Sequence, residues 1–253
     1  VLRLNQGAWK AFGALPSWAR RLTSQLSRPM MNDLRMEYLR RGVAGEELFW
    51  GGAIAFGEDG KRDILTDEAL RRIGDLSSHE IVQKYRSNFD ARCPNPDYLK
   101  WMSYLDLHMR LPELLLMRVD KMSMATSVEA RVPFLDHEFV QLVMSISQSQ
   151  KMPGLRTKHL LKQGVQGLIP DHIINRKKQG FRVPISQWFS DTLGLIAEQK
   201  LRAFCKRTDY FSWSAVSKLI YRQDDLVWYL LNFVLWHELW IEGVPGDELI
   251  QLR

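Results

Sequence analysis

Residues 118 to 136 read Arg-Val-Asp-Lys-Met-Ser-Met-Ala-Thr-Ser-Val-Glu-Ala-Arg-Val-Pro-Phe-Leu-Asp, with ionisable side chains spread through an otherwise apolar run. Up to Thr126, apolar residues recur every three or four positions, which indicates a helix. From Val128 to Val132, apolar and charged residues alternate, which indicates an extended segment with its apolar side chains on one face. Pro133 disfavours helix at the residue before it. The stretch therefore predicts a helix followed by a short extended segment.

The charged residues of this stretch have two interpretations. Glu129 and Arg131 share the polar face of the extended segment, opposite the valines. On composition alone, a structural ion pair at the lip of a buried strand is favoured, because most charged residues are structural or solvated. A catalytic role is the alternative. Asp136 suits the N-cap of a new helix.

The composition is that of an ordinary globular protein. Its 253 residues, of which 45% are hydrophobic, can bury a core as one large domain or two small ones. A net charge of +6 favours anionic partners, but nucleotide phosphates satisfy it as well as nucleic acid does, and we predict no nucleic-acid partner. Cys93 and Cys205 lack metal-ligand spacing, which favours free thiols and a cytoplasmic location. The longest apolar run, 226–236, is too short to span a membrane.

The rest of the chain is predicted to be mostly helical, with no internal repeat. Gly57 to Arg62 is predicted to be a turn, and Leu111-Pro112 to start the helix that enters the central stretch. Trp188 and Phe189 are expected to be buried. The expected helices cover about residues 6–28 (in two pieces), 32–41, 66–73, 77–89, 97–109, 111–126, 136–147, 157–167, 170–174, 184–189, 192–204, 212–222 and 225–242.

The central stretch resembles the signature of the synthetase domain of the glutamine-hydrolysing asparagine synthetase family. A second block, Asn-Arg-Lys-Lys-Gln-Gly-Phe-Arg-Val-Pro at 175–184, resembles the family's next signature at a suitable distance downstream. Two long blocks in the right order are more specific than one short motif. The resemblance implies a mainly α segment, the helical C-terminal portion of an α/β N-type ATP-pyrophosphatase domain. We expect a helical N-terminal portion, 1–112, and a portion carrying both blocks, 113–253, within one continuous domain.

The resemblance also implies an ATP-dependent amidation. A substrate carboxylate such as aspartate would attack the α-phosphate of ATP, and ammonia would then displace AMP from the acyl-adenylate after pyrophosphate has left. ATP and Mg²⁺ are the implied cofactors, and glutamine hydrolysed in a glutaminase domain is the implied source of ammonia. The family's N-terminal cysteine and its Ser-Gly-Gly-x-Asp-Ser loop are not found in the sequence. We therefore expect a C-terminal segment that is inactive by itself.

In the first block, Glu129 occupies the family's glutamate position and is the predicted catalytic residue that orients or deprotonates the incoming nitrogen. Arg131 is expected to keep Glu129 ionised beside the nucleotide, or to form a buried ion pair that fixes the strand. Asp120 matches an acid of the motif and is expected to support the nucleotide site indirectly. Asp136 is interpreted chiefly as a helix cap.

In the second block, Lys178 matches the family lysine that meets the departing pyrophosphate and is predicted to be catalytic. Lys177 and Arg176 would add positive charge for the phosphates. A solvated basic loop is the alternative for all three. The segment Gly45–Gly52 faintly resembles the family's magnesium loop, but Glu46 replaces the expected aspartate. We assign no metal ligand from this resemblance and leave a metal loop open, while a helix N-terminus enriched in acids is the favoured interpretation.

Two other functions remain open on sequence alone. One is the same chemistry on another carboxylate, such as a sugar acid or a lactam-forming substrate. The other is a non-catalytic helical binding module, which the basic charge would suit. A Ser-Gly-Gly-x-Asp loop upstream would support an enzyme over a binding module, and substrate profiling would separate the two enzymes. The oligomeric state, including a homodimer, is left open.

Overall fold

The computed structural model describes residues 37–38, 41–42, 46–51, 54–177, 179–180 and 183–250. These residues are mainly helical, as predicted, and their β pairing is limited to isolated bridges that join Leu65 to Phe211 and Gln166 to Ile169. The helices predicted within residues 6–28 lie outside the described residues. None of the described helices is long and apolar enough to cross a membrane.

Internal contacts divide the chain into two compact units. Unit 1 comprises Val1–Leu48, Ile54–Val82 and Arg182–Arg253, and unit 2 comprises Phe49–Ala53 and Gln83–Phe181. The expected division between residues 112 and 113 follows the signature blocks, and it stays a prediction.

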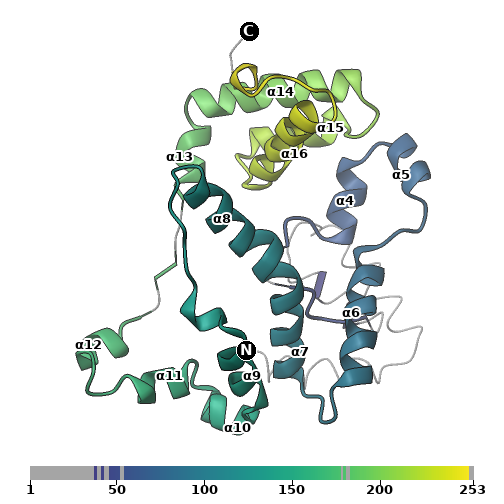
Figure 1. The fold of residues 1–253 in the computed structure, drawn as a ribbon. Coiled ribbons are helices and arrows are strands. Elements are labelled where there is room, and N and C mark those ends of the chain that lie inside the picture. The colour runs from purple at the N-terminus through teal and green to yellow at the C-terminus, as the bar shows by residue number, and fades with distance from the viewer. Residues whose placement is uncertain are drawn as a thin grey trace. The chain divides into compact units, whose positions relative to one another are not determined.

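The core of unit 1 is a layered helical cluster in which α14, α15 and α16 pack together (Figure 1). Phe204, Val216 and Val234 come from these three helices and are completely buried. The chain returns to this cluster at Ser212, whose backbone N–H donates to the carbonyl of Ile64 at 2.8 Å. The described helices of unit 1 are α4 (Glu58–Ile64), α5 (Asp67–Ile73), the start of α6 (Ser78–Arg92), α13 (Ile185–Phe189), α14 (Thr192–Arg207), α15 (Trp213–Tyr221), α16 (Leu226–Trp240) and η5 (Gly246–Glu248).

A buried carboxylate links α14 to α16. Glu238 is only 4% exposed. Lys200 and Arg207, both on α14, each donate to one of its carboxylate oxygens at 2.8 Å. A buried charge is tolerated where it is paired in this way, and the two ion pairs fix the register of the two helices.

Unit 2 is built on an aromatic cluster between α6 and α7. The Phe89 ring lies 5.7 Å from Trp101 and 5.4 Å from Tyr104, measured between centroids. Trp101 and Leu105 are completely buried. The described helices of unit 2 are the rest of α6, α7 (Tyr98–Leu105), η2 (Asp106–Leu116), α8 (Met117–Met124), η3 (Pro133–Leu135), α9 (His137–Ser145), α10 (Gln148–Lys151), η4 (Pro153–Leu155), α11 (His159–Gly164) and α12 (Asp171–Ile174).

The prediction that Leu111-Pro112 starts a helix is wrong. Helix continues without a break from α7 through η2 into α8, and Pro112 lies inside η2, which has π-helical hydrogen bonding. The backbone N–H of Met117 donates to the carbonyl of Pro112, five residues earlier. In an α-helix the proline ring would clash with the carbonyl four residues before it, and the wider π turn gives the ring more room.

The predicted turn at Gly57–Arg62 is also wrong, because α4 begins at Glu58. The Glu58 carboxylate accepts a hydrogen bond from Lys61 Nζ at 2.8 Å and another from the backbone N–H of Ser78 at 3.2 Å. Burial raises the pKa of Glu58, but Lys61 and Ser78 outweigh that effect and hold the pKa below its ordinary value. A partner twenty residues away therefore stabilises a helix that the local sequence disfavours.

Candidate functional site

The first signature block begins on α8 and leaves it through a left-handed residue. Ser127 has φ 57°, and its N–H donates to the carbonyl of Met124 at 3.0 Å. The N–H of Val128 donates to the carbonyl of Ser123 at 2.9 Å. These two bonds form a Schellman motif, which ends the helix and turns the chain into the segment that carries Glu129.

Glu129 and Arg131 form an ion pair on the surface of unit 2. Their closest side-chain atoms, Oε1 and Nη2, lie 2.6 Å apart, and the side chains are 68% and 81% exposed. Val128 is 56% exposed and Val132 is 44% exposed. The expected pairing of Glu129 with Arg131 is present, but the expected burial of the pair and the buried strand are not. The segment 128–132 has no regular structure, and its valines are open to solvent.

The block ends at a well-formed helix start, as predicted. Asp136 Oδ1 accepts from the backbone N–H groups of Glu138 at 3.0 Å and Phe139 at 3.1 Å, which caps α9. The rings of Phe134 and Phe139 meet edge to face with centroids 5.9 Å apart. Asp120 is exposed on α8, upstream of the Schellman motif. Among the described side chains, no hydrogen bond or ion pair joins Asp120 to Glu129.

The second block is described only in part. Arg176 and Lys177 are exposed in a loop after α12, and no ion pair engages either side chain within the described part of the chain. Lys178 lies outside the described residues. No hydrogen bond or ion pair brings Arg176 or Lys177 to Glu129 in the ranges that the structure describes. The two free cations suit phosphate oxygens, which are attracted by exposed, uncompensated positive charge.

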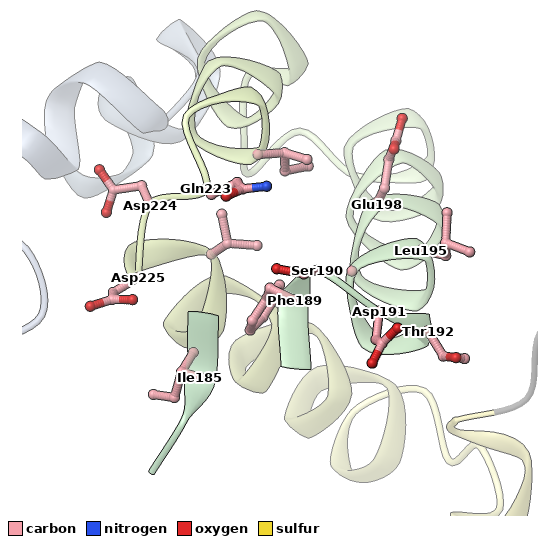
Figure 2. Close-up of a pocket in the computed structure, with 13 residues that line it drawn as sticks. Ile185, Phe189, Ser190, Asp191, Thr192, Leu195, Glu198, Gln223, Asp224 and Asp225 are labelled. Atoms are coloured by element: carbon pink, nitrogen blue, oxygen red, sulfur yellow. The ribbon is translucent and has the colours of Figure 1, made fainter. Parts of the chain in front are cut away.

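The block continues into unit 1, where Pro184 precedes α13. Trp188 was expected to be buried, but it is 44% exposed. Phe189 is partly buried, and it forms one wall of a cavity of about 460 Å³. Figure 2 shows Asp224 and Asp225 on one side of this cavity and Glu198, from α14, on the other.

The described residues do not form a magnesium site. No three His, Cys, Asp or Glu side chains within the described ranges gather closely enough to hold a metal ion, and the carboxylates in Figure 2 are no exception. In the segment Gly45–Gly52, the two end glycines lie outside the described residues. The backbone N–H of Glu46 donates to the carbonyl of Arg41 at 2.9 Å, and Arg41 Nη1 donates to the carbonyl of Glu47 at 3.0 Å. We assign no chemical step to a metal ion in this chain.

Two polar residues that the sequence analysis missed lie in unit 2. Asp106 and Arg110 both line a cavity of about 420 Å³, together with Phe134 and Leu135 of the first signature block. Burial raises the pKa of Asp106, although the Arg110 guanidinium opposes the shift. Two opposite charges four residues apart within an apolar helical run are the sequence signal that marks them.

Comparison with known proteins identifies the family of this chain. Residues 5–238 match the profile described as "Asparagine synthase". The chain belongs to the asparagine synthase family. The match includes both signature blocks, α8 and α9. No solved structure matches the chain significantly.

Curated relatives of this asparagine synthase family chain are considerably longer. It is 29% identical over 242 residues to glutamine-hydrolyzing asparagine synthetase 1 of Bacillus subtilis, with 92% of the chain and 37% of that relative covered. It is 26% identical over 242 residues to a putative glutamine-hydrolyzing asparagine synthetase of Mycobacterium bovis, at 92% and 36% coverage. It is 24% identical over 169 residues to "Amidase chry2" of Gibberella zeae, with 58% of the chain and 25% of that relative covered. The chain thus spans little more than a third of the first two relatives.

Proposed function

We propose that this chain is the helical part of the synthetase site in an ATP-dependent, glutamine-using amidotransferase, which converts a carboxylate, aspartate first among the candidates, to an amide. The observation that carries the proposal is the family match over residues 5–238, which includes both signature blocks. The exposed loop that presents Glu129 and Arg131 supports it, because a group that meets substrate must be reachable.

Glu129 is the proposed acid-base group of the amide-forming step. Its carboxylate orients or deprotonates the ammonia that attacks the adenylate. The Arg131 guanidinium holds that carboxylate in place through the 2.6 Å ion pair. The Schellman motif at Ser127 sets the direction in which the segment leaves α8. Asp120, on the preceding helix, has a supporting role in this scheme.

The basic block is the proposed phosphate side of the site. Lys178 would meet the departing pyrophosphate, while Arg176 and Lys177 supply positive charge around it. Magnesium would neutralise phosphate charge when bound, and its ligands would come from outside the described residues. We further propose that an α/β nucleotide-binding core and a glutaminase domain belong to the same working enzyme, since the curated relatives are almost three times as long as the matched segment.

A different carboxylate is the second candidate substrate. A relative named an amidase, which matches 58% of this chain, is a reason to test carboxylates other than aspartate, such as a sugar acid or a lactam-forming substrate. Adenylate formation at the basic block would be the same for each. At Glu129 the nucleophile would be ammonia for aspartate or a sugar acid, and the substrate's own amine for a lactam-forming substrate.

The test is carboxylate-dependent exchange of pyrophosphate into ATP. The full open reading frame that encodes this chain would be purified and assayed with aspartate, glutamate, a hexuronic acid and a β-amino acid. Exchange that requires aspartate, with asparagine formed when glutamine is added, is the expected result. Exchange with another carboxylate alone would move the assignment to that substrate. A folded protein that exchanges pyrophosphate with none of them would contradict the enzyme and favour a binding module.

A further inference from the structure

The cavity beside the first signature block has mostly apolar walls. It has a volume of about 420 Å³ and lies within unit 2, between η2, η3 and α9. This volume lies within the range of small-molecule pockets, which combine apolar walls with a few polar groups. The apolar lining residues are Leu107, Leu111, Leu115, Phe134, Leu135 and Phe139, with Val140, Val143 and Met144 of α9.

Two charged residues, Asp106 and Arg110, are among the residues that line this cavity, and both are half-buried. Asp106 Oδ1 and Arg110 Nε are buried, and neither atom has a hydrogen-bond partner among the described residues. The two residues are four positions apart on η2, yet no ion pair joins them. Their charges nevertheless influence one another, because Arg110 opposes the rise that burial causes in the pKa of Asp106. One acceptor and one donor therefore remain unused next to the same cavity.

Unused buried polar atoms call for a physical explanation. A polar atom that is shielded from solvent and has no hydrogen-bond partner is destabilising, and most such atoms in proteins are satisfied. The π-helical conformation of η2 is a second unusual feature of the same segment, and π turns occur frequently at functional sites. Both features fall on residues that line one cavity, which indicates a binding site rather than a packing defect.

The polar groups define the head of the ligand. A carboxylate such as Asp106 binds an ammonium group, and a guanidinium such as Arg110 binds a carboxylate. The two charges cancel, so the site favours a head group without net charge over a phosphate or a simple carboxylic acid. The apolar walls favour an aliphatic side chain over a charged one.

We propose that this cavity binds an apolar α-amino acid, with its ammonium group on Asp106, its carboxylate on Arg110 and its side chain against Phe134 and α9. The proposal does not rest on the amidotransferase chemistry, because binding is measured without turnover. It places an amino-acid site next to the segment that carries Glu129, with its two charged residues, Asp106 and Arg110, outside both signature blocks.

The test compares four ligands on the unmodified 253-residue chain by calorimetry and saturation-transfer NMR. L-leucine carries both head groups, 4-methylpentanoate lacks the ammonium, isopentylamine lacks the carboxylate, and L-aspartate has a charged side chain. Leucine is expected to bind at least about tenfold more tightly than each of the other three, since a hydrogen bond to a charged group typically contributes a factor of this size or more. Equal binding of all four, or no binding of leucine, would overturn the proposal.

Variants then assign the two head groups. Asp106→Asn should weaken leucine binding about tenfold and leave the affinity for 4-methylpentanoate unchanged. Arg110→Met should weaken leucine binding and leave the affinity for isopentylamine unchanged. Glu113→Gln and Arg156→Met change exposed residues outside the cavity and serve as matched controls. Circular dichroism checks that each variant is folded. If a variant does not fold, the four-ligand comparison on the unmodified chain still decides the proposal.

Discussion

The Arg131 guanidinium lies 2.6 Å from the Glu129 carboxylate, and both side chains are exposed to solvent. An exposed ion pair contributes little to stability, typically about 0–1 kcal/mol. Its position in the signature of the asparagine synthase family therefore has a better explanation in chemistry than in folding. This distinction can be measured, because stability and catalysis should respond differently to the same substitution.

Glu129→Gln should leave folding almost unchanged and impair amide formation. We expect the unfolding free energy of the chain to change by less than about 1 kcal/mol, because the carboxylate is exposed. In the full protein, loss of one acid-base group should lower asparagine formation by roughly 10²–10⁴-fold, with glutamine hydrolysis retained. Glu138→Gln, an exposed residue of α9, is the control. Normal asparagine formation by a folded Glu129→Gln protein would remove Glu129 from the mechanism.

Local signals explain which elements could be predicted. The Thr66 side chain accepts from the backbone N–H of Ala69 at 3.1 Å, and the Asp97 side chain accepts from that of Lys100 at 2.8 Å. Both side chains cap helices that were predicted to start at these residues. Asp136 behaves in the same way. A cap depends on three or four neighbouring residues, and these are visible in the sequence.

Features that depend on distant partners were not predicted. Helix α4 replaces the expected turn at 57–62, because the N–H of Ser78 donates to Glu58. Pro112 suggests a helix start by local rules, but the surrounding helix accommodates it in a π turn. At the candidate site, the sequence indicated the Glu129–Arg131 pair but not its exposure. Exposure depends on what packs against the valines, which alternation alone does not specify.

Ser127→Gly should stabilise unit 2, because Ser127 has φ 57°, a conformation that a side chain disfavours. We expect the unfolding free energy to rise by roughly 1 kcal/mol, after allowance for the greater backbone freedom of glycine in the unfolded chain. Ser127→Val, with a branched side chain at the same exposed position, should lower it. Urea unfolding checks both. Equal stability of the two variants would mean that the left-handed residue does not limit the helix end.

Glu58→Gln should destabilise unit 1 at neutral pH, and the loss of unfolding free energy should be smaller at acidic pH. The pKa of Glu58 is lowered on folding, so its stabilising effect is fully present above the ordinary glutamate pKa of about 4.3 and is lost as pH falls through the folded value. We expect a loss of about 1 kcal/mol at pH 7, since the Lys61 partner is partly exposed. Urea unfolding at pH 7, 5 and 3.5 measures it.

The control for Glu58 is Glu80→Gln, an exposed carboxylate in the first turn of α6. Its effect should be small at every pH. A Glu58→Gln deficit that stayed constant from pH 7 to 3.5 would show that the variant perturbs packing rather than the ionised contacts with Lys61 and Ser78.

The last prediction separates Lys178 from Lys177 in the second signature block. Lys177 is exposed, and no described acid pairs with it, so Lys177→Ala should weaken apparent ATP affinity in a salt-dependent way, as loss of diffuse positive potential does. A lysine that meets the departing pyrophosphate should interact more strongly as negative charge develops there, and should therefore affect turnover more than ATP binding. In the full protein, Lys178→Ala should depress ATP–pyrophosphate exchange by about one to three orders of magnitude at saturating ATP. Lys178→Arg should rescue poorly, because a planar guanidinium does not replace a compact ammonium. Equal, purely salt-dependent affinity losses for Lys177→Ala and Lys178→Ala, with normal exchange at saturation, would establish this block as a solvated basic loop.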